Sequence, residues 1–149
     1  MVFSFTQKVL FKHCDPAGIV FFPRYFEMMN DCVEAFFEEA LKWPFESFHI
    51  TGGVPTVTIA TKFTAPSRHG DKLILSLEIL RIGRTSFGYL MTAHCSDEQR
   101  FSTEAILVHT NKEGKPQPIP ETVRLHLKKF IKAGSWQIKL FIRVAGPQL

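Results

Sequence analysis

The sequence predicts an α+β fold in which a curved antiparallel sheet wraps one long central helix. Three observations predict it. Residues 24–41 form a helical pattern that is apolar over most of its circumference. Four alternating segments follow, with short connections of the kind that join antiparallel strands. A shorter helical pattern comes after them, near the end of the chain.

The chain of 149 residues fits one domain, 1–149, in which only the part after Gly134 has no assigned element. Hydrophobic residues make up 45% and charged residues 21%, as in soluble globular proteins. The three cysteines show no CxxC or Cys/His spacing, so we expect no metal site, and free thiols suit a reducing cytoplasm. Without a signal-peptide core or an apolar run near ~18 residues, a cytoplasmic location is expected.

The net charge of +4 is mild and would favour any anionic partner, from nucleic acid to a membrane surface or a phosphate-bearing small molecule. Only a pI near 9.1 favours nucleic acid, and the chain has neither a recognisable nucleic-acid motif nor a dense basic run. We therefore expect no nucleic-acid partner and no membrane partner.

The first expected element is a strand, because polar and apolar residues alternate from Phe3 to Phe11. Next comes the long helix, from Arg24 to Leu41, with Pro23 before it, where a proline costs little. Its polar residues recur at spacings of four, three and four, and its other positions are largely apolar, so other elements should surround it. The polar stripe consists of Glu27, Asp31, Glu34 and Glu38.

Residues 42–53 read as a loop that two glycines end. Alternation then predicts strands over 57–63, 73–79, 87–93 and 101–107. The second helix is expected to begin at Pro120 and to end before Gly134. Residues 135–149 alternate weakly, which fits either a last strand or a disordered tail.

The chemically informative segment is HCDPAGIVFFPRYF, residues 13–26. Pro16 restricts Asp15 to extended geometry, and Gly18 allows a tight turn or a close approach by a ligand. The helix starts just after, and its first N–H groups lack internal partners and can hold negative charge on a carbonyl oxygen. A carboxylate beside such a helix end is what acyl transfer requires. The alternative is a purely structural Asp15, since Asp-Pro is common in turns and Asp is a common cap.

This segment resembles the signature of the 4-hydroxybenzoyl-CoA thioesterase family, which has the hotdog fold. FTAPSRHGDKL, with Pro66 and Asp71, is similar to the family's strand-to-strand element, and LRIGRTSF to its later turn. The resemblance covers roughly residues 6–130. It implies a hotdog in which the long helix lies inside the curved sheet, followed by a short C-terminal helix.

The resemblance also implies an activity: hydrolysis of an acyl-CoA to the free acid and CoA, without metal or cofactor. The implied substrate is 4-hydroxybenzoyl-CoA or another aromatic or short-chain acyl-CoA. Homodimers or homotetramers with sites at subunit interfaces are implied too. The residues that it implies are Asp15 as the catalytic carboxylate, the Phe22 N–H as the group polarising the thioester carbonyl, Gly18 beside the site, Tyr25 and Asn30 toward the substrate, and Arg84, Thr85 and Ser86 in the turn facing the CoA phosphates.

Two departures leave the acyl group open: Asn30 stands where the benzoyl-specific type has an acidic residue, and the turn carries fewer basic residues. Asp15 is either a nucleophile that forms a mixed anhydride or a base that activates water. The alternatives are a thioesterase acting on acyl carrier protein and a non-catalytic acyl-CoA-binding protein. His13 either assists Asp15 or is an ordinary strand-end residue, and nothing near Cys14 marks it as a nucleophile.

Overall fold

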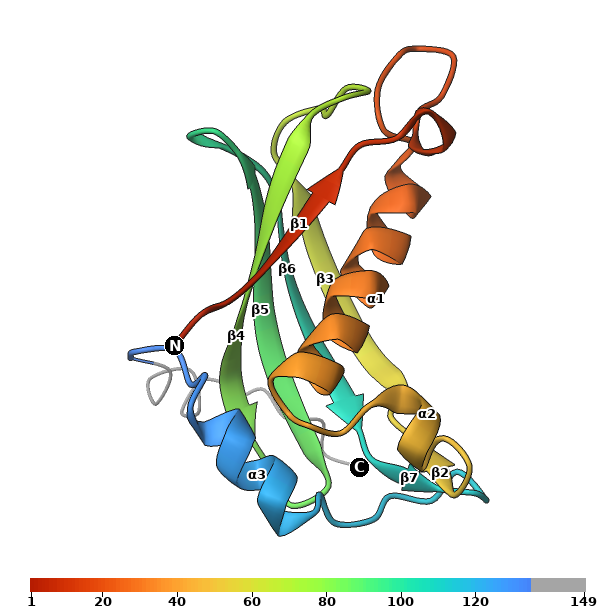
Figure 1. The fold of residues 1–149 in the computed structure, drawn as a ribbon, viewed down its shortest axis with the longest axis vertical. Coiled ribbons are helices and arrows are strands. Elements are labelled where there is room, and N and C mark those ends of the chain that lie inside the picture. The colour runs from red at the N-terminus through yellow and green to blue at the C-terminus, as the bar shows by residue number, and fades with distance from the viewer. Residues whose placement is uncertain (135–149) are drawn as a thin grey trace, which may run out of the picture.

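The computed structural model describes residues 1–134. The expectation of a last strand or a disordered tail falls on 135–149, outside the described residues. A five-stranded antiparallel sheet, in the order β1-β4-β5-β6-β3, curves round helix α1 (Phe22–Glu39), as Figure 1 shows. This confirms the predicted α+β architecture. The strands are β1 (Phe3–Lys8), β3 (Thr56–Phe63), β4 (Lys72–Ile82), β5 (Ser86–Cys95) and β6 (Glu98–Val108).

Smaller elements complete the described part of the chain. A two-stranded ribbon pairs β2 (Gly52–Gly53) with β7 (Thr110–Asn111), and the short helix α3 (Glu121–Lys128) lies beyond it. Helix α1 begins two residues before the predicted start, so its bounds were slightly wrong. Helix α3 begins one residue after Pro120 and ends before Gly134, as predicted. Across residues 1–134, no helix combines the length and apolar character that a membrane crossing requires.

The prediction that the first strand runs to Phe11 was wrong. The strand ends at Lys8, and a 3-10 helix spans Phe11–His13. The ladder stops because its partner strand β4 begins at Lys72, opposite Lys8. Phe11 is 81% exposed. The alternating sequence pattern therefore continues beyond Lys8, where β1 no longer has a neighbouring strand to pair with.

Residues 42–53 are not only a loop, as predicted, because they also contain helix α2 (Phe45–Phe48) and β2. Pro44 supplies the extended residue before α2. Aromatic packing holds this single turn in place: the Phe48 ring stacks on Trp43 at 4.0 Å, and the Phe45 ring meets Phe37 edge-on at 5.0 Å. A helical turn this short is stabilised by tertiary contacts, and it is too short to show a helical periodicity in the sequence.

The core lies between α1 and the concave face of the sheet. Phe36 and Phe37 of α1 are fully buried, as is Phe101 of β6. Burying side chains of this size stabilises a fold by ~1.5–3 kcal/mol each. The predicted polar stripe of α1 is exposed along its length, so the helix orientation read from the sequence is confirmed.

Strand β3 forms an open edge of the sheet. It pairs with β6 on one side, and no strand of residues 1–134 covers its other side. Its side chains are exposed almost throughout, including Val57 at 54% and Phe63 at 45%. Such an edge offers unpaired N–H and C=O groups to a further strand.

Candidate functional site

The segment with Asp15 folds into a tight hairpin just before α1. An isolated bridge joins Cys14 to Val20, and the Asp15 N–H donates to the Ile19 carbonyl at 2.9 Å. The Gly18 N–H donates in turn to the Asp15 carbonyl at 2.9 Å, with Gly18 at φ +82°, a conformation that favours glycine. Of the two roles that the sequence allowed for Gly18, the structure shows the tight turn.

The Asp15 carboxylate is half-buried and only partly used by the fold. Its Oδ1 accepts a hydrogen bond from the Ala17 N–H at 2.9 Å, which makes a side-chain turn. Its Oδ2 has no hydrogen-bond or ion-pair partner among residues 1–134. One oxygen thus does the structural work that the sequence allowed, and the other is available for chemistry.

The start of α1 is open in the same region. The residue before the helix, Phe21, supplies no side-chain cap, and the first turn contains no acidic residue. Pro23 has no N–H, and the Arg24 N–H donates to the Phe21 carbonyl at 2.8 Å. The Phe22 N–H finds no acceptor within the described chain. A free donor at the positive end of the helix can stabilise an oxyanion.

A buried polar network braces this hairpin from the segment before β4. The Val20 N–H donates to the Ser67 carbonyl at 2.8 Å. The Ser67 hydroxyl accepts from the Tyr25 hydroxyl at 2.9 Å and from Arg100 Nη1 at 3.1 Å. Arg100 also bonds Asp71 Oδ2 at 2.7 Å. The network ties the hairpin, the first turn of α1 and β6 together.

The contacts within this network determine the protonation states of Asp71 and Tyr25. The Arg68 N–H and the Arg100 guanidinium, which both bond the Asp71 carboxylate, hold its pKa below the usual value. Burial raises the pKa of the Tyr25 phenol. Asp71 is therefore charged and Tyr25 neutral near pH 7, and Tyr25, 4% exposed, faces Ser67.

Sequence reasoning singled out Pro66 and Asp71 but missed Ser67 and Arg100. Ser67 lies within the motif FTAPSRHGDKL, but no local pattern in the sequence shows that its hydroxyl is buried. Arg100 comes from a strand 29 residues after Asp71, and only the folded sheet brings the two together.

His13 supports the hairpin from inside. Its side chain is buried, and Nδ1 accepts the Leu10 N–H at 2.8 Å, while its carbonyl accepts the Phe21 N–H at 2.9 Å. Burial, with a smaller effect from Lys12, lowers the pKa of the imidazole. The ring is thus neutral near pH 7 and contacts Leu10, with no hydrogen bond to Asp15.

The turn with Arg84, Thr85 and Ser86 lies at the far end of the sheet. The Arg84 side chain is exposed, and its carbonyl accepts bonds from the Ile119 N–H at 2.9 Å and from Arg124 at 3.1 Å. The Asp15 hairpin contacts the segment before β4, whereas this turn follows β4, an 11-residue strand. At ~3.3 Å per residue, β4 is about 33 Å long, so the hairpin and the turn lie toward opposite ends of this strand. Figure 1 shows the start of α1 and helix α3 at opposite ends of the sheet.

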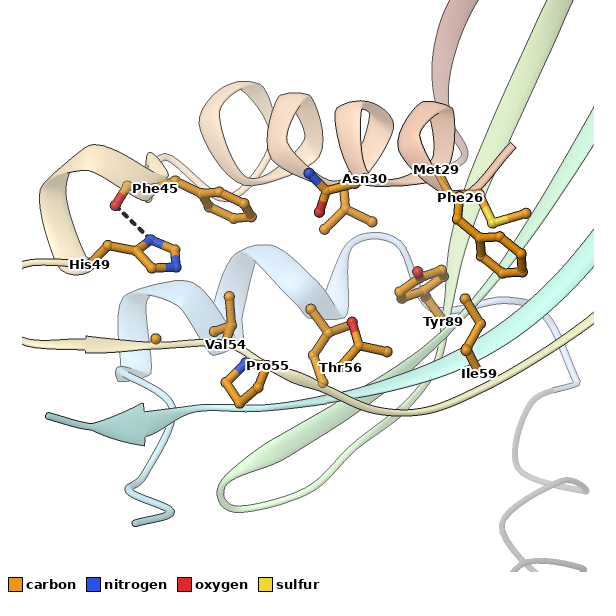
Figure 2. Close-up of a pocket in the computed structure, with 13 residues that line it drawn as sticks. Phe26, Met29, Asn30, Phe45, His49, Val54, Pro55, Thr56, Ile59 and Tyr89 are labelled. Atoms are coloured by element: carbon orange, nitrogen blue, oxygen red, sulfur yellow. Dashed lines mark hydrogen bonds between the residues drawn. The ribbon is translucent and has the colours of Figure 1, made fainter. Parts of the chain in front are cut away.

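A cavity of about 580 Å³ opens between α1 and β3, within the ~300–1,000 Å³ typical of small-molecule sites. Asn30 reaches it from α1 and Tyr89 from the sheet, as Figure 2 shows. The structure thus places Asn30 on this cavity, apart from the Arg84 turn. The other lining residues are Phe26, Met29, Val33, Phe45, His49, Gly53, Val54, Pro55, Thr56, Ile59 and Leu107.

Within the part of the chain that the structure describes, no group of His, Cys, Asp and Glu side chains is arranged to hold a metal ion. His109 and His126 instead bond main-chain carbonyls, those of Pro118 and Leu41, each at 2.9 Å. The described geometry therefore offers an aspartate, a helix end and a cavity.

Known proteins share this architecture. A 1,4-dihydroxy-2-naphthoyl-CoA thioesterase from Synechocystis superposes with a TM-score of 0.79 at 19% identity, over 86% of this chain and 96% of that one. The 4-hydroxybenzoyl-CoA thioesterase from Pseudomonas sp. strain CBS-3 gives 0.77 at 20% identity, over 84% and 98%. A gentisyl-coenzyme A thioesterase gives 0.75 at 27% identity, over 85% and 99%.

No curated protein matches the chain. The sequence profile of the Thioesterase-like superfamily matches residues 9–127, which is most of the chain and includes the Asp15 hairpin, α1 and the whole sheet except β1. The resemblance seen in the sequence is thereby confirmed. The chain belongs to the Thioesterase-like superfamily and is a thioester hydrolase with the hotdog fold.

Proposed function

We propose that the protein hydrolyses an acyl-CoA, with Asp15 as the catalytic carboxylate and the Phe22 N–H as the donor to the thioester carbonyl. The observation that carries this proposal is the pair of unused groups at one junction. The Asp15 Oδ2 and the Phe22 N–H are both without partners in the described chain, and the hairpin and the helix start are joined by the Phe21–His13 hydrogen bond.

The two groups suit both routes for the reaction. As a nucleophile, Asp15 bonds to the carbonyl carbon, the C–S bond breaks, CoA leaves as the thiolate, and water cleaves the mixed anhydride. As a base, Asp15 takes a proton from the water that attacks the carbonyl carbon. The C–S bond then breaks, the free acid forms, and CoA leaves as the thiol with that proton. In both routes the tetrahedral intermediate carries an oxyanion, which the Phe22 N–H stabilises.

A panel of short-chain, long-chain and aromatic acyl-CoAs tests this function. We expect stoichiometric release of CoA and free acid for at least one class. Tight binding of an acyl-CoA that is recovered unhydrolysed would instead identify an acyl-CoA-binding protein. Hydrolysis of acyl carrier protein thioesters but of no acyl-CoA would identify acyl carrier protein as the thiol carrier of the substrate.

We further propose a homodimer, as the unit or as half of a homotetramer, formed through the β3 edge. Thr56 lies opposite Leu107 and Phe63 opposite Phe101, so β3 runs from the end of the sheet with the Arg84 turn to the end with the Asp15 hairpin. Two β3 strands that pair antiparallel about a two-fold axis would bring the Arg84 end of one protomer beside the Asp15 end of its partner.

This arrangement reconciles the positions of the expected site residues. Within one protomer the Asp15 hairpin and the Arg84 turn lie toward opposite ends of β4, a strand about 33 Å long. A site at the subunit interface would take its catalytic carboxylate from one chain and its phosphate contacts, through Arg84, Thr85 and Ser86, from the other. Tyr25 would have a positioning role, because its hydrogen bond to Ser67 fixes the first turn of α1.

We infer a cytoplasmic location from the thiols. Cys14, Cys32 and Cys95 are all free, and burial raises the pKa of the Cys32 thiol to about 12, so this thiol is unreactive. Free thiols are usual in a reducing compartment.

A further inference from the structure

The hydroxyl of Tyr89 is an unpaired polar group at the floor of the cavity. Tyr89 lies on the concave side of β5 and is 3% exposed. Its hydroxyl has no hydrogen-bond partner within residues 1–134. The hydroxyl is not fully enclosed by residues 1–134 either. The only fully enclosed side-chain atoms there without a hydrogen bond are Arg81 Nε and Arg100 Nε, and Arg100 Nε lies 2.9 Å from Glu98 Oε1. The hydroxyl therefore opens into the cavity that its side chain lines.

Comparable buried hydroxyl groups of this protein are paired. The Tyr25 hydroxyl donates to Ser67 at 2.9 Å, and the Thr103 hydroxyl meets Thr61 at 2.7 Å and the Ala60 carbonyl at 3.2 Å. Because buried tyrosine hydroxyls usually find a partner, an exception that faces a cavity points to a ligand.

The surroundings of Tyr89 specify the kind of ligand. The walls beside it are apolar side chains from α1 and from the sheet, including Met29, Val33 and Leu107. Figure 2 shows Asn30 and His49 at other positions round the same space, and His49 Nδ1 is already bonded to the Phe45 carbonyl at 2.8 Å. The cavity thus combines apolar contact area with a few placed polar groups, as small-molecule sites do.

We propose that Tyr89 is a specificity-determining residue that selects acyl groups carrying a hydrogen-bonding oxygen remote from the thioester. The inference rests on the proposed hydrolysis of an acyl-CoA, and it adds that this cavity receives the acyl part of the substrate. The acyl oxygen would bond the Tyr89 hydroxyl, while the hydrocarbon part packs against the apolar walls.

The physical basis is the cost of leaving the hydroxyl unpaired. In the empty cavity water can bond to it. A hydrocarbon acyl group displaces that water and leaves the hydroxyl without a partner, whereas an oxygen-bearing group replaces the bond. Sites built to bond a substrate oxygen reject the analogue without it strongly, so we expect a discrimination of about tenfold or more in kcat/KM.

The test is Tyr89→Phe, which removes the hydroxyl and leaves the ring. The substrates are benzoyl- and naphthoyl-CoAs hydroxylated at each ring position, each with its methyl isostere. In the wild type, at least one hydroxylated substrate should exceed its methyl isostere by about tenfold or more in kcat/KM. In Tyr89→Phe that ratio should fall close to one, chiefly through slower turnover of the hydroxylated member.

The chain supplies its own control, since Tyr25 is its other tyrosine. Tyr25→Phe removes a hydroxyl that bonds Ser67 and does not line the cavity, so it should change both substrates alike and leave the ratio intact. Equal ratios in the wild type and in Tyr89→Phe, with turnover retained, would overturn the inference about Tyr89 and leave the proposed function standing. That outcome is expected if a partner subunit fills the cavity.

Binding of the free acids separates the two proposals. Calorimetry should show that the hydroxylated acid binds the wild type more tightly than its methyl isostere, and that Tyr89→Phe removes this preference. If this holds while no acyl-CoA is hydrolysed, the proposed function fails and the role of Tyr89 in selecting the ligand stands. No preference by either measurement contradicts the inference.

Discussion

Replacing Asp15 by Asn separates its structural role from its chemical role. The structural role consists of one hydrogen bond, from the Ala17 N–H to Oδ1 at 2.9 Å, and an Asn amide oxygen can accept the same bond. The carboxylate forms no ion pair within residues 1–134, so no paired charge is lost. The change removes the negative charge and the nucleophilic Oδ2, which the described fold does not use.

The expected magnitudes differ sharply for the two roles. The free energy of unfolding should change by less than about 1 kcal/mol, because the turn keeps its hydrogen bond. For a domain of this size that is a shift in Tm below about 4 °C. The value of kcat should fall by about 10²-fold or more, equivalent to ~2.7 kcal/mol of barrier.

The assay follows release of the CoA thiol under saturating acyl-CoA, with Tm measured on the same samples. Asp97→Asn is the matched control, since Asp97 is an exposed aspartate in the turn between β5 and β6 and its loss changes the net charge equally. The control should retain both activity and Tm. An Asp15→Asn enzyme with near wild-type kcat, or one whose lost activity merely tracks unfolding, would refute the assignment.

Three further predictions follow from the same geometry. Arg84→Ala should raise KM for an acyl-CoA several-fold with a smaller effect on kcat, and unchanged steady-state kinetics would remove this turn from the phosphate site. Light scattering should find a dimer or tetramer, and Val57→Lys, which places a charge on the exposed β3 edge, should shift it to monomer with loss of activity; a wild-type monomer at micromolar concentration contradicts the interface. Burial holds the pKa of folded His13 below its ordinary value of 6.5, so as the pH falls the unfolded chain is protonated at His13 before the folded chain is. The free energy of unfolding therefore includes a contribution from neutral His13 that is present above pH 6.5 and is lost as the pH falls below it. Between pH 7.5 and 5.5, Tm should therefore fall more in the wild type than in His13→Asn, and equal slopes would rule this effect out.

The sequence predicted the parts of the fold that depend on periodicity. Alternation located each main strand, and the polar stripe beginning at Glu27 oriented α1. Periodicity could not show where a strand loses its partner, as after Lys8, or that aromatic contacts hold α2 as a helical turn. Both depend on segments that are distant in the chain.

In the candidate site, too, the sequence predicted local features and missed contacts between distant segments. The sequence indicated an extended Asp15 and allowed a tight turn at Gly18, because Pro16 and Gly18 act locally on the backbone. The bond between Arg100 and Asp71 links two parts of the sheet, and no local signal marks it. Alternation places Tyr89 on the inward face, but only the packed structure shows that its hydroxyl lacks a partner and faces a cavity.

The most direct test of the account is the hydrolysis of acyl-CoA by the purified protein, with CoA and free acid quantified together. The account predicts that both products appear in equal amounts for at least one acyl class, and that Asp15→Asn slows this by about 10²-fold or more while folding normally. An acyl-CoA that binds and is recovered unhydrolysed, across the whole panel, would contradict the central claim.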